Sequence, residues 1–279
     1  MGLERLQSGA ALLFVERGLP TALVPNRDLG IQVQGDLSEG VLSYAAGLFN
    51  GVVDGGMGDS DVDDSKELAG RLFAQPFKKG TSLLQGLSLG VAGSWGSTSG
   101  ALPAYKTPGQ VPFFTYTDTT VAGGRRLRLA PQFTYYTGPL GLLGEYTTSK
   151  YKVVRKTDSA TLQHSAWQLA ASYLLSGDQA TFKGVSPKKP LDPSKGQWGA
   201  LELAARIHKL AVDQDAYPIF ASTKKSARSA TAWSVGINWY LSRNTKLNAD
   251  YEQTQFKGGD AKGDRDTEKI FFNRFQVSF

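Results

Sequence analysis

The feature that most constrains this chain is a sustained alternation of apolar and polar residues. In the segment TAWSVGINWYL, every second side chain is apolar: Trp233, Val235, Ile237, Trp239 and Leu241. A turn at residues 243–245 follows, and the alternation resumes over residues 246–252. Successive side chains of a strand point to opposite faces, so each stretch predicts a β-strand with one apolar and one polar face. Two such strands joined by so few residues predict an antiparallel hairpin.

About eleven stretches of this kind occur along the chain. We expect strands over residues 29–36, 41–50, 67–76, 83–95, 125–136, 141–154, 162–175, 197–210, 231–241, 246–256 and 268–279. Many of them exceed about ten residues, whereas strands of globular proteins most often have about 5–6. Because of this length and two-faced pattern, we predict an all-β fold: an antiparallel transmembrane β-barrel, here incomplete, with about eleven strands.

The expected connections differ in length. Tight turns are predicted at residues 38–40, 78–81, 137–140 and 242–245, and long polar loops at 51–66, 96–124, 155–161, 211–230 and 257–267. Short turns at one end and long loops at the other are typical of outer-membrane barrels. Residues 176–196 break the alternation, so this connection is either long or marks a wrongly divided strand.

Aromatic residues gather near the ends of the expected strands, at Trp95, Tyr135, Tyr136, Tyr146, Tyr173, Trp198, Trp239 and Tyr240. Rings with a polar tip suit the head-group level of a bilayer. The alternative is that they form the core of a β-sandwich.

The chain closes on FFNRFQVSF, in which Phe271, Phe275, Val277 and Phe279 share one parity and polar residues the other. In the barrel interpretation, the aromatic face meets lipid and the polar face lines a lumen. The last strand then completes a wall, with Phe279 on its lipid side.

Composition excludes several kinds of site. The chain has no cysteine and only two histidines, His164 and His208, which excludes disulfides, thiol catalysis and a His-rich metal centre. The acidic segment GDSDVDDSKE does not fit a calcium-binding EF-hand loop, since Gly70 stands where the twelfth-position glutamate is needed. We therefore expect no metal and no other cofactor.

The net charge of +6 favours anionic partners, and no nucleic-acid partner is expected. No run of 18 apolar residues is present, which excludes a transmembrane helix but not barrel strands. The first residues, MGLERLQSGA, lack the basic and apolar regions of a secretory signal.

Several longer segments resemble one known family. They are GLERLQS, GRLFAQPF, RLRLAPQFTYYTGPLGLLGEY, KGVSPKKPLDPSKGQWGALELAAR and INWYLSRNTKLNADY, and the resemblance to the phosphate-selective porin O and P family runs from Leu3 to Phe279. The resemblance implies a sixteen-stranded, homotrimeric channel in the outer membrane of a Gram-negative bacterium. It would pass phosphate, polyphosphate or other small anions through a basic constriction. It also implies contact with outer-membrane lipid and recognition of Phe279 by the barrel assembly machinery.

Members of the family have sixteen strands, whereas this sequence predicts about eleven. Single-chain bacterial barrels use even strand numbers. We therefore expect an N-terminally shortened barrel that lacks about five strands.

The strongest pore candidates lie in GRRLRLAPQ. Leu127 and Leu129 have the parity of the lipid face, so Arg126 and Arg128 point inward, two residues apart. Arginine suits phosphate because its planar fork donates two charge-assisted hydrogen bonds. These two residues resemble the basic ladder of the family, although arginines at the rim of the membrane are an alternative.

Residues 1–28 resemble the constriction loop that family members fold into the lumen, and residues 29–279 then form the strands and loops of the barrel. Arg5, Arg17 and Arg27 are candidate pore-lining residues in this segment. Glu4 and Glu16 are positioned to neutralise them instead.

Inward parity adds Arg206, His208 and Arg274, together with the acidic residues Glu145, Asp250 and Glu252. Mixed charges on a wall often pair with each other, so these rank below Arg126 and Arg128.

Two other functions stay open at this stage. A general or sugar-selective porin would rely on aromatic residues, such as those of residues 101–117. A barrel enzyme would need a nucleophile beside a base, and no G-x-S-x-G motif is present. We therefore predict a passive porin and no enzyme.

Overall fold

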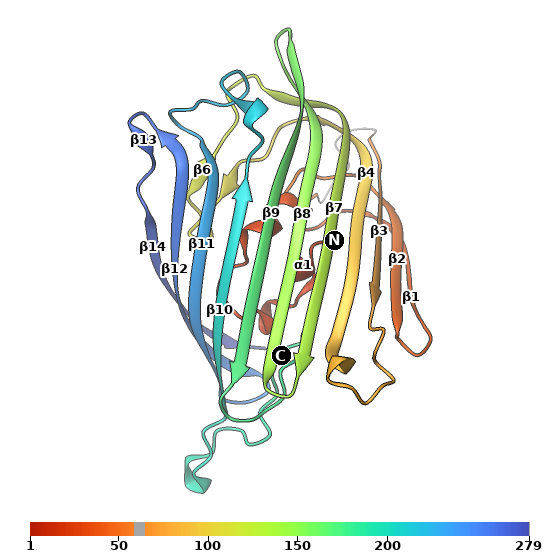
Figure 1. Cartoon of the computed structure of the whole chain (residues 1–279), viewed down its shortest axis with the longest axis vertical. Helices are drawn as coiled ribbons and strands as arrows, with labels where there is room; N and C mark the ends of the chain where they lie inside the picture. The colour runs from red at the N-terminus through yellow and green to blue at the C-terminus, as the bar shows by residue number, and fades with distance from the viewer. Residues whose placement is uncertain (59–64, 279) are drawn as a thin grey trace.

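The computed structural model describes residues 1–58 and 65–278. Its main element is a curved antiparallel sheet, here called the wall, whose long strands pair in sequence order (Figure 1). These strands are β1 (Gly30–Leu37), β2 (Leu42–Phe49), β3 (Glu67–Ala74), β4 (Leu87–Gly100), β7 (Val121–Thr137), β8 (Leu140–Arg155), β9 (Asp158–Leu174), β10 (Ala200–Ala211), β11 (Ala227–Tyr240), β12 (Thr245–Asp260) and β14 (Glu268–Val277). The eleven expected strands are thereby confirmed.

The remaining elements are short. They are the strands β5 (Tyr105–Lys106), β6 (Pro112–Phe114) and β13 (Gly263–Asp264), the helix α1 (Leu3–Leu6), and the 3₁₀ turns η1 (Gly9–Ala11), η2 (Leu19–Leu23), η3 (Leu83–Gly86), η4 (Pro193–Lys195) and η5 (Gln214–Ala216). Across the described part of the chain, no helix has the length and apolar content needed to cross a bilayer.

The wall does not close on itself. Among the described residues, β1 pairs only with β2, and β14 pairs only with β12. An antiparallel, incomplete barrel was predicted, and the open sheet with sequential hairpin topology confirms it.

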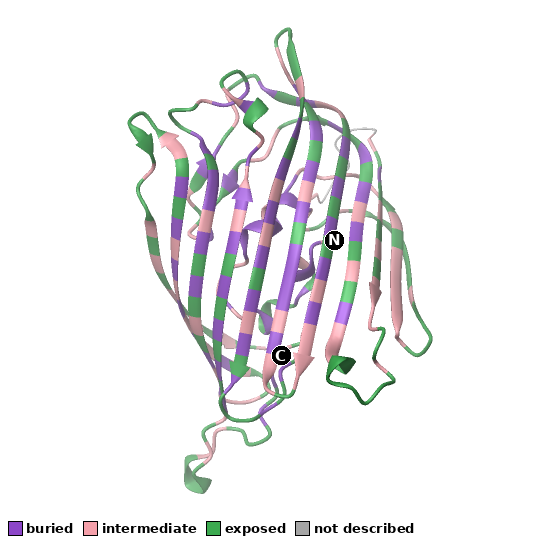
Figure 2. Ribbon diagram, viewed as in Figure 1, coloured by how far each residue is buried: buried purple, intermediate pink, exposed green. Residues whose placement is uncertain are grey.

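Buried and exposed residues alternate along the long strands of the wall, as the two-residue repeat predicts (Figure 2). On β12, inward Asn248, Asp250 and Glu252 are buried, whereas on β11 outward Trp233 and Val235 are 41% and 48% exposed. Other long strands also expose large apolar side chains on the outward face. Examples are Leu89, Leu127, Leu129, Leu169, Leu203, Ile207, Ile237, Phe271 and Phe275. A water-soluble protein buries its large apolar side chains, whereas this wall carries them on its outside.

Residues 1–28, here called the inner segment, lie on the concave side of the wall (Figure 1). The backbone N–H of Leu3 donates to Glu145 Oε2 at 2.6 Å, and that of Val15 donates to Asp250 Oδ1 at 3.0 Å. Lys246 Nζ donates to the carbonyl oxygen of Leu12 at 2.8 Å. Polar groups on the inner face of the wall therefore hold this segment by its backbone.

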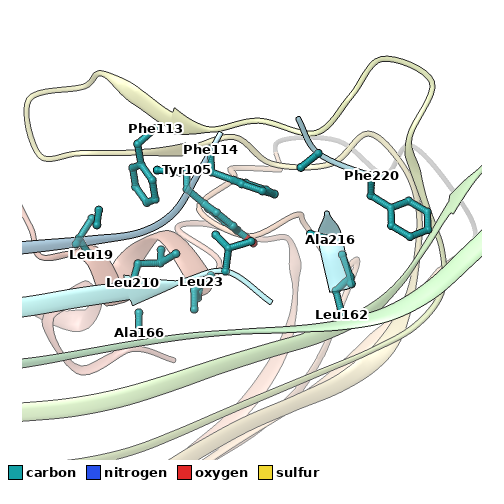
Figure 3. Packing of buried hydrophobic residues seen from close by; sticks show 14 of the residues in the cluster. Leu19, Leu23, Tyr105, Phe113, Phe114, Leu162, Ala166, Leu210, Ala216 and Phe220 are labelled. Atoms are coloured by element: carbon teal, nitrogen blue, oxygen red, sulfur yellow. The ribbon is translucent and has the colours of Figure 1, made fainter. Parts of the chain in front are cut away.

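Residues 101–120 also fold inward, over the inner segment. Phe113 and Phe114 of β6 pack in one buried apolar cluster with Leu19 and Leu23 of the inner segment and with Leu210 of the wall (Figure 3). This cluster fixes two chain segments against the same part of the wall.

Two expectations about strands and connections need correction. Residues 155–161 were expected to form a long loop, but β8 and β9 run up to a two-residue turn at residues 156–157, where Lys156 has a φ of 55°. Val153 and Leu162 both bury their side chains on either side of this turn. Residues 83–86 form a 3₁₀ turn instead of the start of a strand. Of the two alternatives for residues 176–196, the long connection is confirmed, since residues 175–199 join β9 to β10. The acidic residues 59–64 and Phe279 lie outside the described residues.

Candidate functional site

Arg126 and Arg128 point inward from β7, as predicted, and both are buried. Arg128 Nε lies 2.7 Å from Asp54 Oδ1, and its Nη1 lies 2.6 Å from Glu67 Oε1. Arg126 donates to Glu67 Oε2 through Nε at 3.1 Å and through Nη2, and to Thr98 Oγ1 at 3.2 Å.

The result is a buried cluster of two guanidinium groups and two carboxylates. Formal charges cancel, and the third donor of Arg128, Nη2, is taken by the carbonyl oxygen of Val52 at 2.8 Å. Burying such charges costs several kcal/mol per ion unless they are paired. The cluster therefore ties β3, β7 and residues 52–54 together.

Arg206 of β10 lies in a second buried cluster, between two carboxylates. Its Nη1 lies 3.2 Å from Glu4 Oε1, and its Nη2 lies 3.0 Å from Glu252 Oε2. The guanidinium also stacks over the ring of Phe14, at 4.3 Å from the centroid. Arg206 thus anchors the inner segment to β10 and β12.

His208 adds a further anchor beside this cluster. Its Nδ1 accepts a hydrogen bond from the backbone N–H of Leu19 at 3.1 Å, so the ring proton resides on Nε2. Nε2 then donates to Glu252 Oε2 at 3.2 Å. A neutral imidazole in one fixed tautomer holds η2 against the wall.

Arg5 and Arg17 of the inner segment are held in a different way. Arg5 Nη2 donates to the carbonyl oxygen of Thr21 at 2.7 Å. Arg17 donates to the carbonyl oxygens of Glu4, at 3.2 Å, and Gln7, at 2.8 Å. Within residues 1–58 and 65–278, neither guanidinium forms an ion pair with a carboxylate. Carbonyl oxygens fix their positions but do not cancel their charge.

Both residues line a cavity of about 430 Å³ on the concave side of the wall. Its lining comes from three regions: the inner segment with Arg5, Glu16 and Arg17, residues 53–56, and residues 103–110 with Lys106. Three cationic side chains therefore share this cavity with Glu16 and with Asp54, whose carboxylate is already bound to Arg128. The arrangement suits a small anion with several acceptor oxygens.

The charges in the cavity influence one another. Burial lowers the pKa of Arg5, and the nearby positive charge of Arg17 lowers it further. Burial raises the pKa of Glu16, against the opposing effect of Arg274 and Arg17. Glu16 therefore takes up a proton at a higher pH than an exposed glutamate does.

The loop that carries Lys106 is fixed by a chain of hydrogen bonds. His164 Nδ1 accepts from the backbone N–H of Asp213 at 3.1 Å, so Nε2 donates to the hydroxyl of Tyr116 at 2.7 Å. The hydroxyl oxygens of Tyr116 and Tyr151 are 2.8 Å apart, and those of Tyr151 and Tyr105 are 2.9 Å apart. Two loop tyrosines are thus joined to β8 and β9.

Arg27 and Arg274 lie elsewhere. Arg27 is exposed and lines a separate cavity of about 340 Å³ together with Arg71. Arg274 is half-buried on β14 and donates to the carbonyl oxygens of Val15 and Gly9 at 3.4 Å. The predicted arginines therefore fall into the two buried clusters, the cavity with Arg5 and Arg17, and these two separate places.

Sequence reasoning did not single out Lys106. A signal is present in the sequence, since Lys106 is the only charged residue among residues 101–117, although the aromatic residues of this stretch favour a sugar path. Among the described residues, no group of three or more His, Cys, Asp or Glu side chains is arranged to hold a metal ion.

The chain is similar to one solved porin, with 12% sequence identity and a TM-score of 0.46, over 88% of this chain and 62% of that porin. The chain thus spans less than two thirds of the length of that porin. A search of curated proteins finds no match. The sequence model of the family described as phosphate-selective porin O and P matches residues 1–279. The chain belongs to the phosphate-selective porin O and P family.

Proposed function

We propose that the protein works as an outer-membrane porin that lets anions, phosphate in particular, diffuse passively past Arg5, Arg17 and Lys106. The observation that carries this proposal is the cavity in which these cations meet without carboxylate partners of their own. Fixed positive charge at a narrow place raises the local concentration of anions and lowers that of cations.

The inner segment takes the role of a constriction in this proposal. It is held by Arg206, His208 and Glu145 of the wall, so its arginines stay in place while ions pass. Pre-positioned donors reduce the ordering that an anion must impose on binding. No energy source is needed, since diffusion follows the gradient.

Arg126 and Arg128 have a supporting role in the same proposal. Asp54, which lines the cavity, is neutralised by Arg128 and so repels a passing anion less than a free carboxylate would. The two arginines therefore offset the carboxylate charge at the border of the cavity, and their ion pairs also stabilise the fold.

A sugar-selective porin is the competing proposal. Such a channel needs exposed aromatic rings along its path, and Tyr105, Phe113 and Phe114 are at most 1% exposed. The burial of these rings argues against a sugar path along residues 101–117.

The family also motivates the proposal of a homotrimer in the outer membrane of a Gram-negative bacterium. Recognition of Phe279 by the barrel assembly machinery is a separate part of this proposal. A light-scattering mass of the detergent-solubilised protein tests the trimer, and a monomeric mass would contradict it.

The decisive experiment is a planar-bilayer measurement on the Arg5→Gln/Arg17→Gln variant. We expect the permeability ratio of chloride to potassium to fall on the order of tenfold, since a unit charge near an ion path is worth about 1–2 kcal/mol at intermediate dielectric. Millimolar phosphate should block chloride current in the wild type and do so much less in the variant. Arg27→Gln, outside this cavity, is the matched control. Equal selectivity in wild type and double variant would reject the proposal.

A further inference from the structure

The outward side of the wall carries a row of basic residues near one end. Here the loop end is the end at which residues 50–66, 101–120 and 212–226 connect the strands. The row, called the basic belt, consists of Arg125 on β7, Lys150 and Lys152 on β8, Lys209 on β10, Lys257 on β12 and Lys269 on β14. Five of these side chains are exposed, and Lys209 is half-buried.

Register places members of the basic belt beside outward apolar side chains of the neighbouring strands. Lys150 pairs across strands with Leu127, and Lys209 pairs with Trp167. Arg125 packs over the ring of Trp95, with 5.8 Å between Cζ and the centroid. Each of these neighbours faces outward, and Leu127 and Trp95 are 50% and 51% exposed. The belt therefore occupies the level at which a bilayer changes from hydrocarbon to head groups.

Acidic residues are absent from this row in the described strands. The carboxylates in the interior of β8, β10 and β12 are buried on the inner face: Glu145, Glu202, Asp250 and Glu252. The remaining acidic residues of β7 to β12 and β14, namely Asp158, Asp260 and Glu268, stand at the first or last position of their strands. None of the six basic side chains forms an ion pair with a described residue. Within the interior of these strands, the outward face thus carries basic side chains without acidic ones, whereas the inner face carries charges of both signs.

From this row of cations we infer that the basic belt binds lipids whose phosphate head groups carry a net negative charge. A row of unpaired cations at head-group depth attracts anionic lipid, and each lysine or arginine near the surface adds to the attraction. Aromatic residues beside the cations position the ring tips at the same depth. The inference rests on the proposed function in one respect: the proposed function places the wall in a membrane.

Quenching of tryptophan fluorescence by brominated lipid tests the inference. The full chain is reconstituted into phosphatidylcholine vesicles that contain either dibrominated phosphatidic acid or dibrominated phosphatidylcholine, with Trp95 and Trp167 beside the belt as reporters. We expect wild type to prefer phosphatidic acid by about fivefold or more, and Lys150→Gln/Lys152→Gln/Lys209→Gln to lose that preference. A preference that is unchanged in this triple variant would overturn the inference.

The matched control neutralises three exposed lysines in loops at the same end: Lys224→Gln/Lys225→Gln/Lys262→Gln. It should keep the preference within about twofold, because these side chains lie outside the belt. An equal loss in this control would mean a general charge effect and would also overturn the inference. If the belt triple variant does not fold, the single variants Lys150→Gln and Lys209→Gln each give a partial loss that the control lacks.

Two further arms separate this inference from related ones. Inorganic phosphate added at constant ionic strength should leave the lipid preference unchanged. If inorganic phosphate abolished the lipid preference, the belt would be assigned to soluble anions instead. Arg17→Gln should change anion selectivity without changing lipid preference, whereas the belt variants should do the reverse. A chain that binds phosphatidic acid but shows no anion selectivity would contradict the proposed function alone.

Discussion

Arg128 and Asp54 form a fully buried ion pair, with 2.7 Å between Arg128 Nε and Asp54 Oδ1. Arginines on the concave side of the wall serve two different purposes. Where carboxylates surround a guanidinium, it joins chain segments, and where carbonyl oxygens hold it, as for Arg17, its charge remains available.

The first prediction concerns this pair. Arg128→Gln removes the cation from a buried site and leaves Asp54 and Glu67 without full compensation, which should destabilise the fold by about 3–5 kcal/mol. The midpoint of urea unfolding in detergent measures the change. Arg125→Gln, on the outward side of the same strand, should alter the unfolding free energy by less than about 0.5 kcal/mol. Equal effects would show that the buried cluster adds no stability.

The second prediction concerns pH and Glu16. Burial raises the pKa of Glu16 above its ordinary 4.5, so the carboxylate becomes neutral at a higher pH than an exposed glutamate does. As pH falls through this raised pKa, the cavity loses a negative charge, and the chloride-to-potassium permeability ratio should rise. Bilayer reversal potentials between neutral pH and pH 4.5 record this rise. Glu16→Gln should show the higher ratio at every pH, and an unchanged pH dependence in this variant would contradict the assignment to Glu16.

The raised pKa of Glu16 also makes the stability of the fold depend on pH. An acid whose folded-state pKa is raised binds its proton more tightly in the folded state than in the unfolded state, so the folded protein is favoured as pH falls through the raised value. Between the raised pKa and 4.5, Glu16 therefore stabilises the protein slightly as acid is added, and this gain is absent at neutral pH.

The third prediction tests whether the outward face meets hydrocarbon. Val235 is 48% exposed near the middle of β11, and Val235→Arg should destabilise the protein by about 2–4 kcal/mol if lipid surrounds it. Gln255→Arg, outward on β12 near the loop end, should change the stability by only about 0–1 kcal/mol. Unfolding from vesicles measures both, and two equally mild effects would place this face in water.

The fourth prediction concerns the loop that carries Lys106. Tyr116→Phe removes the hydroxyl that connects His164 with Tyr151, and two buried polar groups lose a partner. We expect a loss of about 1–3 kcal/mol and faster proteolysis within residues 101–120. The matched control is Tyr146→Phe, because Tyr146 is 43% exposed on the outer face. Equal cleavage rates in both variants would mean that the hydroxyl chain does not hold the loop.

The strand plan could be predicted because it depends on local pattern. Alternation fixes which side chains share a face, so Arg126 and Arg128 were placed inward and Leu127 outward before any coordinates were available. The turn at residues 156–157 was missed because polar residues there, such as Lys156, look like a loop in sequence, although the strands remain paired up to Arg155 and Asp158.

Charge pairing could not be predicted in the same way. Asp54 is 74 residues away from Arg128 in sequence, and Glu4 is 202 residues away from Arg206. Nothing local distinguishes an arginine that will meet a carboxylate from one that will meet a carbonyl oxygen. The folding of residues 101–120 over the inner segment, which brings Lys106 to the cavity of Arg5 and Arg17, is a long-range event of the same kind.

By itself, the sequence determined that this chain forms a wall with an apolar and a polar face, because the two-residue repeat of a strand converts order along the chain directly into sidedness. Only the tertiary structure decided which inward charges are neutralised and which are not. That outcome depends on distances between segments far apart in sequence, and the Coulomb interaction responds to these distances and to burial, not to separation along the chain.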